Sequence, residues 1–468
     1  MPSEVDCPIE KMRLADLNQA SISAFQRAYE QLCNGEDLKI YEESIEPVDD
    51  LNHYDDLPDC ETEEVINLLR ETVIIKLNGG MGTGMGLEKV KSLLPVRGET
   101  NFLDIIVKQL LHLRSSYSED LRFLLMNSFS TSDDTKSYLS KYPDLGNIES
   151  IELLQNRVPK ISIDSLAPVN FPDSPKLEWC PPGHGDIYSS LLGTGLLDEL
   201  LNEGVRFAFI SNSDNLGATL DFNILNSFKE GGASFLMEVT QRTEADKKGG
   251  HLAKGKGTGS LLLREIAQCE EKDASFFQDI CKHRYFNTNN IWIRLDALKE
   301  HMMNSGGILE LPIIRNRKTV DPTDPNSSPV YQLEVAMGAA IQCFKDSVAL
   351  NVPRSRFAPV KTSEDLFALQ SDAYSMTEDF QIQLMPERHG TPPIISLDDS
   401  FYARADQLNL ATQLGVPSLL NCIKLQVEGP VAFNKGTIFQ GSVVVRNRSK
   451  QIKDLPAGKY HDEIIELN

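Results

Sequence analysis

VIIKLNGGMGTGMGLEKVKS, residues 73–92, runs from an apolar strand into a loop that contains five glycines. Val73, Ile74 and Ile75 predict a buried strand, because all three are β-branched and apolar. Glycines have no Cβ, so the backbone N–H groups of the loop can come close to an anion. Lys91 adds a positive charge at the far end of the loop. The stretch therefore predicts a polyphosphate site at the end of a buried strand.

This loop fits neither of the common phosphate-binding templates. No Gly-Lys pair is followed by Ser or Thr, and the glycines never fall in the order G-x-G-x-x-G. Both a P-loop ATPase and a dehydrogenase are therefore disfavoured. A flexible glycine-rich turn beside a solvated lysine is the structural alternative.

Strands and helices alternate after this first strand. Further strands are predicted at RFLLMN (122–127), FAFIS (207–211) and SFLMEV (234–239), and an amphipathic helix at FLDIIVKQLLHLR (102–114). Such alternation predicts an α/β sheet with helices on both faces and a site in the loops at the carboxyl ends of its strands. The glycine loop and residues 212–215 each follow a strand, so we expect them at the same rim.

Composition narrows the class of protein and its partners. The chain has 468 residues, of which 41% are hydrophobic, and this predicts a globular protein of two or three units. Its apolar runs fall far short of the ~20 residues that span a membrane, and acids and Pro fill the N-terminus, so we expect the cytoplasm and no membrane. The net charge of −22 disfavours nucleic acid as a partner. The eight scattered cysteines, with no C-x-x-C pair, disfavour a zinc site or a disulfide framework.

Four more motifs accompany the glycine loop: WCPPGHGDIY (179–188), SNSDNLGA (211–218), FNTNNIWI (286–293) and PVKTSEDL (359–366). Together with LNGGMGTGMG they resemble, in content and in order, the UTP–glucose-1-phosphate uridylyltransferase family, also called UDP-glucose pyrophosphorylases. The resemblance is clear over roughly residues 70 to 370 and looser in the C-terminal part. It implies that the uridylyl group of UTP passes to glucose-1-phosphate, giving UDP-glucose and pyrophosphate in a reversible, Mg²⁺-dependent, direct in-line displacement.

The resemblance also implies a fold and three parts. The fold is a Rossmann-like nucleotidyltransferase fold (GT-A-like), with a mixed sheet flanked by helices. We expect a helical N-terminal segment (1–70) packed on the core, with apolar positions from Leu14 to Leu32 near helical spacing, then a catalytic domain (71–415) and a small C-terminal domain (416–468). The family implies a left-handed β-helix in the last part, although the spacing of its apolar residues fits a plain meander equally well.

Asp214 is the residue expected to bind Mg²⁺. It follows the strand FAFIS, and Mg²⁺ in nucleotide enzymes is commonly held by one or two carboxylates and phosphate oxygens. The alternative is a helix cap or a turn formed with Asn215. In the family, the counterparts of Asn212 and Ser213 serve the sugar phosphate.

Gln155 and Gly183 are the expected readers of uracil. An amide that both donates and accepts, beside a close backbone contact, complements the edge of this base. His184 is expected to contact the sugar or phosphate, with a structural histidine in a tight turn as the alternative. It is not expected to act as a general base, because a sugar-phosphate oxygen is already ionised at neutral pH.

Two lysines are expected to neutralise phosphate charge. Lys91 would reach the phosphates that leave as pyrophosphate, and Lys361 the α-phosphate under attack; a solvated surface position is the alternative for each. The family usually has Pro where this chain has Val90, and a smaller, Gly-containing stretch before it. Whether Lys89 or Lys91 contacts phosphate is therefore open.

The remaining site residues follow from the same resemblance. Asn289 matches the residue that binds the glucose hydroxyls, and its alternative is turn formation. The full nucleotide-binding set is Leu77, Asn78, Gly79, Gly80, Lys91, Gln155, Gly183, Asp214 and Lys361.

Two other functions stay open. One is a broader UDP-sugar or UDP-N-acetylhexosamine pyrophosphorylase, which would accept other sugar-1-phosphates. The other is a non-catalytic nucleotide-binding homologue, which would be expected to lack Lys91, Asp214 or Lys361; all three are present. The sequence does not set the oligomeric state and is compatible with a homo-oligomer.

Overall fold

A large mixed sheet forms the centre of the molecule. The computed structural model describes residues 6–82, 85–86, 90–118 and 120–467, and within these ranges eleven strands join this sheet. Its main path runs through β2 (Asn52–His53), β18 (Val348–Asn351), β12 (Phe235–Gln241), β15 (Tyr285–Arg294), β11 (Phe207–Asn212), β3 (Thr72–Asn78), β6 (Arg122–Asn127) and β7 (Glu152–Leu154). Strand β15 is antiparallel to both neighbours, whereas the other neighbours on this path are parallel.

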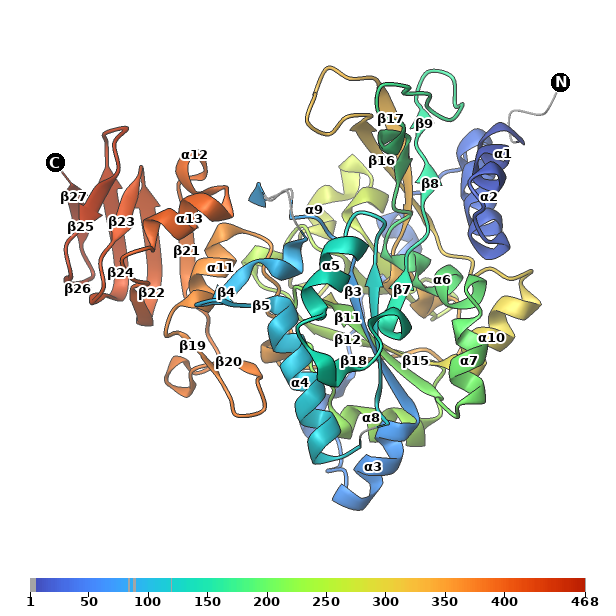
Figure 1. The fold of residues 1–468 in the computed structure, drawn as a ribbon, viewed down its shortest axis with the longest axis horizontal. Helices are drawn as coiled ribbons and strands as arrows, with labels where there is room; N and C mark the ends of the chain where they lie inside the picture. The colour runs from blue at the N-terminus through green and yellow to red at the C-terminus, as the bar shows by residue number, and fades with distance from the viewer. Residues whose placement is uncertain (1–5, 83–84, 87–89, 119, 468) are drawn as a thin grey trace.

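Helices cover both faces of this sheet, as the sequence predicts (Figure 1). One face packs against α3 (Thr62–Arg70), α4 (Phe102–Ser116) and α8 (Phe222–Gly231), and the other against α6 (Ile187–Gly193), α7 (Leu196–Asn202) and α10 (Leu295–Asn304). Both faces of β3 are buried, which explains its continuous run of apolar residues. Ile74 packs on the face covered by α3, α4 and α8, and Val73 and Ile75 pack on the opposite face.

The N-terminal segment is partly helical and partly incorporated into the sheet. Helices α1 (Asp6–Leu14) and α2 (Gln19–Cys33) form the predicted helical part. One face of α2 is buried in a cluster that includes Val158 and Cys180; its residues are Ile22, Phe25, Tyr29 and Leu32. Leu14 is 80% exposed, so it does not belong to the predicted apolar face. Strands β1 (Ile45–Glu46) and β2 add to edges of the central sheet, which periodicity does not predict.

The C-terminal part is built from parallel strands. One sheet contains β21 (Ile394–Leu397), β22 (Ser418–Glu428), β24 (Thr437–Asn447), β26 (Gly458–His461) and β27 (Ile464–Leu467), and a second contains β23 (Val431–Phe433) and β25 (Lys453–Leu455). The first sheet thus begins before residue 415, and Phe433 stacks on Phe367 of the preceding region at 5.3 Å between ring centroids. The domain limits given above stay a prediction.

Smaller elements complete the fold. They are β4 (Pro95–Arg97), β5 (Thr100–Asn101), α5 (Ser132–Leu139), β8 (Val158–Pro159), β9 (Ile161–Ser162), β10 (Trp179–Cys180), β13 (His251–Gly255), β14 (Leu261–Arg264), α9 (Ala274–Phe277), β16 (Ile313–Thr319), β17 (Pro329–Val335), α11 (Ser363–Gln370), β19 (Tyr374–Met376), β20 (Ile382–Leu384), α12 (Asp399–Tyr402) and α13 (Ala405–Ala411). In the part of the chain that the structure describes, no helix has the length and apolar character needed to cross a membrane.

Candidate active site

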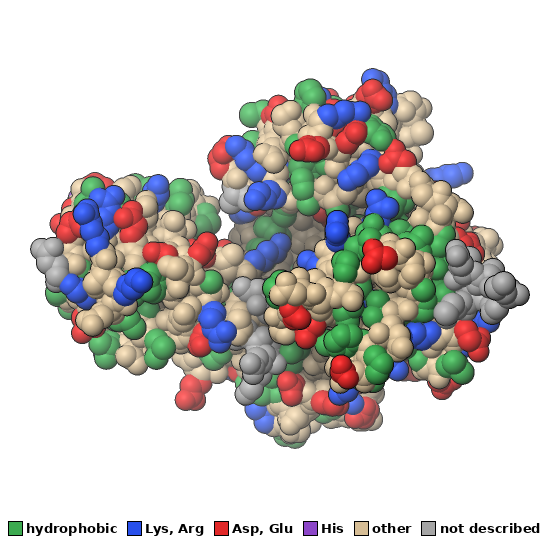
Figure 2. Space-filling view, turned by 90° about the horizontal axis from the view of Figure 1, so that it is seen from above, with side chains coloured by type: hydrophobic (Ala, Val, Ile, Leu, Met, Phe, Trp, Pro, Cys, Tyr) green, Lys and Arg blue, Asp and Glu red, His purple; other side chains and the backbone are tan. Residues whose placement is uncertain are grey.

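A cleft of about 290 Å³ lies at the carboxyl ends of β3 and β11. These strands are parallel, with Leu77 beside Asn212, so the glycine loop and the Asp214 loop meet at one rim as the sequence predicts. The cleft is lined by Leu77, Gly79, Gly80, Lys91, Met126, Gln155, Pro181, Gly183, His184, Asn212, Ser213, Asp214 and Glu334. Figure 2 shows a hollow between the C-terminal part and the body of the molecule, with Lys and Arg side chains at its edge.

Backbone pairing joins the two ends of the glycine loop. Met81 and Val90 form an antiparallel bridge, and the backbone N–H of Lys91 donates to the Gly80 carbonyl at 3.2 Å. The Lys91 ammonium donates to Asp214 Oδ2 at 2.6 Å, and both side chains are about one-fifth exposed. The two charged groups predicted to serve the phosphates are thus paired with each other. Lys89 lies outside the described residues.

Asp214 retains an oxygen that suits a cation. Its Oδ1 is buried and has no hydrogen-bond partner in the described structure, whereas Oδ2 is taken by Lys91. Within the described ranges, no cluster of three or more His, Cys, Asp or Glu could hold a metal. The donor set therefore fits Mg²⁺ held by one carboxylate and phosphate oxygens, since Mg²⁺ keeps oxygen ligands and rarely takes an all-protein cage.

The predicted uracil readers are bonded to each other. The Gln155 amide nitrogen donates to the Gly183 carbonyl at 2.8 Å, and the side chain is buried. A Cβ on Gly79 would come within 3.0 Å of Gln155 Oε1, so glycine lets the amide approach. Gly183 has φ +83°, and a Cβ there would lie 2.5 Å from the Val335 carbonyl oxygen. Both the conformation and the space therefore require glycine at position 183.

His184 is held in one tautomer. Its Nδ1 accepts a hydrogen bond from the Met337 backbone N–H at 3.0 Å, which leaves Nε2 as the protonated nitrogen. Burial, and then the positive charge of Lys361, lower the pKa of His184 to about 4. The ring is therefore neutral near pH 7 and acts as a hydrogen-bond donor.

Lys361 approaches the cleft from the segment before α11. Its backbone N–H donates to Asp365 Oδ2 at 2.8 Å, which belongs to the capping box of that helix. The residue is exposed. Its charge lowers the pKa of His184 and opposes the burial that raises the pKa of Glu265, so the ammonium lies near both groups.

Asn78 and Ser213 support the loops from within. Asn78 is 2% exposed; its Nδ2 donates to Asn127 and Thr135, and its Oδ1 accepts from the Ser213 hydroxyl at 3.2 Å. The Ser213 backbone N–H donates to the Leu77 carbonyl at 3.0 Å. These contacts tie the ends of β3 and β11 together.

Asn289 lies in a bulge of β15. The pairing with β12 shifts between Glu238 and Val239, and Asn289 has φ +58°, a conformation that Asn tolerates better than most residues. The pairing of β15 with β11 ends at Ile291 and Ile210, so Asn289 lies just beyond this paired stretch, on the side of the carboxyl end of β11. Asn289 and Lys361 do not line the central cleft itself, so they extend the site beyond it.

Met126, Pro181 and Glu334 line the cleft but were not predicted from the sequence as site residues, and neither was Asp186 beside it. Glu334 lines the cleft, and burial raises its pKa. Asp186 binds the backbone N–H of Asn156 at 2.8 Å, directly after Gln155, and burial raises its pKa to about 6. Glu334 carries no local signal. Asp186 stands within the quoted PPGHGD motif, which could have drawn attention to it.

Known proteins of similar sequence and fold point to one family. The family model described as UTP–glucose-1-phosphate uridylyltransferase matches residues 22–440. UTP–glucose-1-phosphate uridylyltransferase 2 of Dictyostelium discoideum is 38% identical over 90% of this chain and 82% of its own, and the Musa acuminata uridylyltransferase is 38% identical over 95% of each.

Solved structures agree with these sequence relatives. A Leishmania major UDP-glucose pyrophosphorylase mutant in complex with UDP-glucose is 45% identical over the full length of both chains, with a TM-score of 0.94. A UDP-glucose phosphorylase from Trypanosoma brucei is 46% identical over 99% of this chain and 100% of its own, with a TM-score of 0.92.

Proposed function

The chain belongs to the UTP–glucose-1-phosphate uridylyltransferase family, and from this premise we propose how its cleft joins UTP and glucose-1-phosphate to give UDP-glucose and pyrophosphate. The observation that carries the proposal is the meeting of the glycine loop, Gln155, Gly183 and Asp214 around one cleft. These residues come from distant parts of the chain.

Uracil binds on the side of Gln155 and Gly183. The Gln155 amide is already oriented by the Gly183 carbonyl, and the missing Cβ of Gly183 lets this turn pack closely against the backbone of Val335. A preformed site of this kind discriminates by hydrogen bonding, because a wrong base would leave buried polar groups without partners. Leu77, Gly79 and Gly80 form the adjoining wall.

The triphosphate binds over the glycine loop. Lys91 exchanges its carboxylate partner for the phosphates that leave as pyrophosphate, and Lys361 neutralises charge at the α-phosphate. Asp214 would hold Mg²⁺, which supplies positive charge to the phosphate oxygens in the transition state. Asn78 keeps the loops in place from below.

The sugar phosphate binds toward Asn212, Ser213, His184 and Asn289. His184 donates through Nε2, and Asn289 projects from its bulge at the same rim. An oxygen of glucose-1-phosphate then attacks the α-phosphorus of UTP, the bond from that phosphorus to the β-phosphate oxygen breaks, and pyrophosphate leaves. The attacking oxygen is already ionised, so alignment and charge neutralisation suffice without a general base.

We also propose that the C-terminal parallel strands form a left-handed β-helix. The support is that β22, β24 and β26 pair in parallel one after another, while β23 and β25 pair on a second side. Apolar residues at Leu425, Phe433 and Val443 are buried between these sides.

Pyrophosphate release tests the function directly. Purified protein would be supplied with UTP, Mg²⁺ and a panel of glucose-, galactose- and N-acetylglucosamine-1-phosphate. We expect glucose-1-phosphate to give the highest kcat/KM. Equal rates with the other sugars would favour the broader pyrophosphorylase, and no release with any of them would favour a non-catalytic homologue.

A further inference from the structure

The loop that carries Asp214 is joined to the segment that carries Lys361 by backbone pairing. The Val360 N–H donates to the Asp214 carbonyl at 3.1 Å, and Asn215 and Pro359 form an isolated antiparallel bridge. The two residues are far apart in the sequence. The metal-binding and phosphate-neutralising residues proposed above are thus attached to one short two-stranded unit.

The side chain of Asn215 completes this unit. It is 2% exposed and makes four hydrogen bonds. Its Oδ1 accepts from the backbone N–H groups of Gly217, at 3.2 Å, and Ala358, at 2.9 Å. Its Nδ2 donates to the Arg356 carbonyl and to Asn290 Oδ1, both at 3.2 Å. The bonds to Arg356 and Ala358 join the Asp214 loop to the 355–361 segment, whereas the bonds to Gly217 and Asn290 fix the amide within its own loop and against β15.

Gly217 allows the two segments to approach. A Cβ at this position would lie 2.3 Å from the Ser355 carbonyl oxygen, which is backbone and cannot rotate away. The loop and the 355–361 segment are therefore in direct backbone contact beneath the cleft.

A buried ion pair underlies this contact. The Arg356 guanidinium binds both oxygens of Glu238, at 2.6 and 2.7 Å, and also donates to the Thr219 carbonyl at 3.0 Å. Glu238 is fully buried and also accepts from Asn290 and Trp292. Removing Arg356 or Glu238 would leave the other charge buried without this partner, so the ion pair fixes the position of the segment that carries Arg356.

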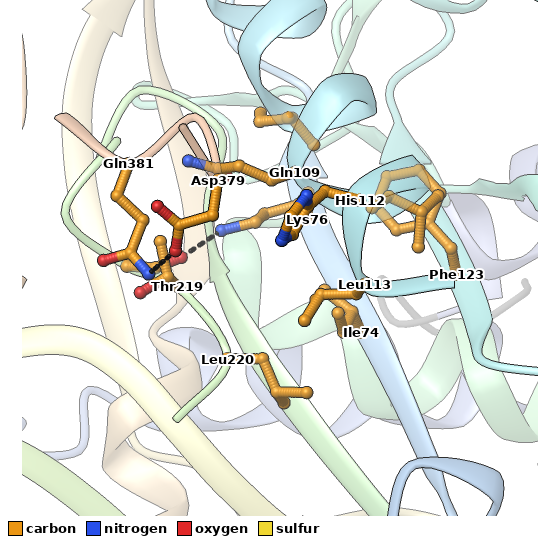
Figure 3. A pocket seen from close by; sticks show the side chains of 13 residues that line it. Ile74, Lys76, Gln109, His112, Leu113, Phe123, Thr219, Leu220, Asp379 and Gln381 are labelled. Atoms are coloured by element: carbon orange, nitrogen blue, oxygen red, sulfur yellow. Dashed lines mark hydrogen bonds between the residues drawn. The ribbon is translucent and has the colours of Figure 1, made fainter. Parts of the chain in front are cut away.

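Lys76 holds the same loop from the far side. Its ammonium donates to the Ala218 carbonyl at 2.5 Å and to the Ser211 hydroxyl at 2.8 Å. Figure 3 shows Lys76 close to Thr219, in a cavity of about 50 Å³ separate from the cleft. The loop is therefore fixed at both ends, and Asn215 is the residue whose side chain adds hydrogen bonds to the backbone pairing between the loop and the Lys361 segment.

We propose that Asn215 is a positioning residue that couples Asp214 to Lys361, so that the two charged groups keep one spacing and move as a unit. The inference rests on the roles proposed above for these two residues. Asn215 itself touches backbone and Asn290 only, so it acts on the reaction through the segments that it joins.

A double-mutant cycle tests the coupling. We expect Lys361→Ala alone to lower kcat/KM by ~10²-fold and Asn215→Ala alone by roughly 10-fold or more. In the Asn215→Ala background, Lys361→Ala should cost at least ~10-fold less than in the wild type, because the ammonium is no longer held in place. Independent, multiplied effects in folded proteins would overturn the inference, since a residue that only stabilises the fold would not change the cost of Lys361→Ala.

Two further variants keep the test decisive. Asn215→Asp has nearly the same size and can be used if Asn215→Ala does not fold. Its second oxygen would face the Arg356 carbonyl and Asn290 Oδ1, so it would weaken the contact between the two segments without leaving a cavity. Asn409→Ala, at an exposed position, should show no coupling to Lys361→Ala. Near-normal activity of Lys361→Ala alone would overturn its proposed role and the inference together, whereas a large but uncoupled effect would overturn only the inference.

Discussion

The two sides of the cleft hold their ligand groups in different ways. On the side of Gln155 and His184, the proposed base and sugar-phosphate contacts are neutral, buried or nearly so, and fixed by hydrogen bonds to backbone groups. On the phosphate side, Lys91 and Asp214 are charged, partly exposed and bonded to each other, and Lys361 is exposed. Under the proposed roles, the neutral groups are in place before a nucleotide binds, whereas Lys91 and Asp214 would have to change partners.

This difference follows from the energetics of the two kinds of contact. Leaving a buried neutral donor or acceptor without a partner costs about 1–3 kcal/mol, so the side of Gln155 and His184 gains from being rigid. The Lys91–Asp214 ion pair can be exchanged, because phosphate oxygens would replace the carboxylate as the partner of the ammonium. We therefore expect substitutions on the rigid side to change selectivity and substitutions on the exchangeable side, the side of Lys91, Asp214 and Lys361, to change the rate.

The largest effect is expected at Asp214. Asp214→Ala should lower kcat by at least ~10²-fold with the fold intact, because it removes the carboxylate proposed to hold Mg²⁺ and frees Lys91. Initial rates over a Mg²⁺ titration would measure it, with Asp144→Ala, an exposed aspartate, as the control. A near-normal rate at saturating Mg²⁺ would show that Asp214 does not hold the metal.

The lysines should come next. Lys91→Ala and Lys361→Ala should each depress kcat/KM by ~10²-fold, and Arg should restore only part of it, because its planar group does not reproduce a compact ammonium. Lys450→Ala, at an exposed position, serves as the control.

The wild-type kinetic pattern checks the direct displacement in which these lysines take part. Double-reciprocal plots for UTP and glucose-1-phosphate should intersect. Parallel lines, with exchange of label between UTP and pyrophosphate in the absence of sugar phosphate, would indicate a covalent intermediate instead.

A smaller, more selective effect is expected at Gln155. Gln155→Ala should reduce the preference for UTP over CTP by ~10-fold or more while the ranking of sugar phosphates stays unchanged. Competition between the two nucleotides would measure it, and Gln413→Ala, an exposed glutamine, should leave the ratio as it is. A constant ratio in Gln155→Ala would show that the rigid side reads the base through other groups.

The smallest effect is expected on the stability of the protein, through Lys76, which donates a hydrogen bond to the loop that carries Asp214. Burial, and then the charge of Arg356, lower the pKa of Lys76 from 10.5 to about 7, although Glu238 opposes this. Between these two pH values the unfolded chain binds a proton that the folded protein has released, so the free energy of unfolding rises with pH. Relative to Lys76→Met, the wild type should therefore gain stability from pH 7 toward pH 10.5. Urea unfolding of both proteins at several pH values would measure this, and a pH-independent difference would contradict it.

Local patterns in the sequence predicted the parts of this fold that depend on near neighbours. The strands at residues 73–75, 122–127 and 207–211 and the helix α4 appear where apolar periodicity places them. The meeting of the glycine loop with Asp214 followed from parallel strands sharing one rim. Such features need only short-range signals and one topological rule.

Other features depend on pairing between distant segments, which periodicity does not encode. The antiparallel direction of β15, the Lys91–Asp214 ion pair and the contact of Asn215 with the 355–361 segment all arise from how remote elements come together. The Mg²⁺ site, the roles of the site residues, the compartment and the oligomeric state stay predictions.

The burial of His184, together with the nearby charge of Lys361, decides how its ring responds to acid. An ordinary histidine changes charge when a cell acidifies during stress or fermentation, because its pKa lies near 6.5. With a pKa of about 4 and one ring nitrogen occupied, His184 presents the same uncharged face through such a fall. If His184 contacts the sugar phosphate as proposed, this contact should keep its strength as the pH falls from 7 to 5.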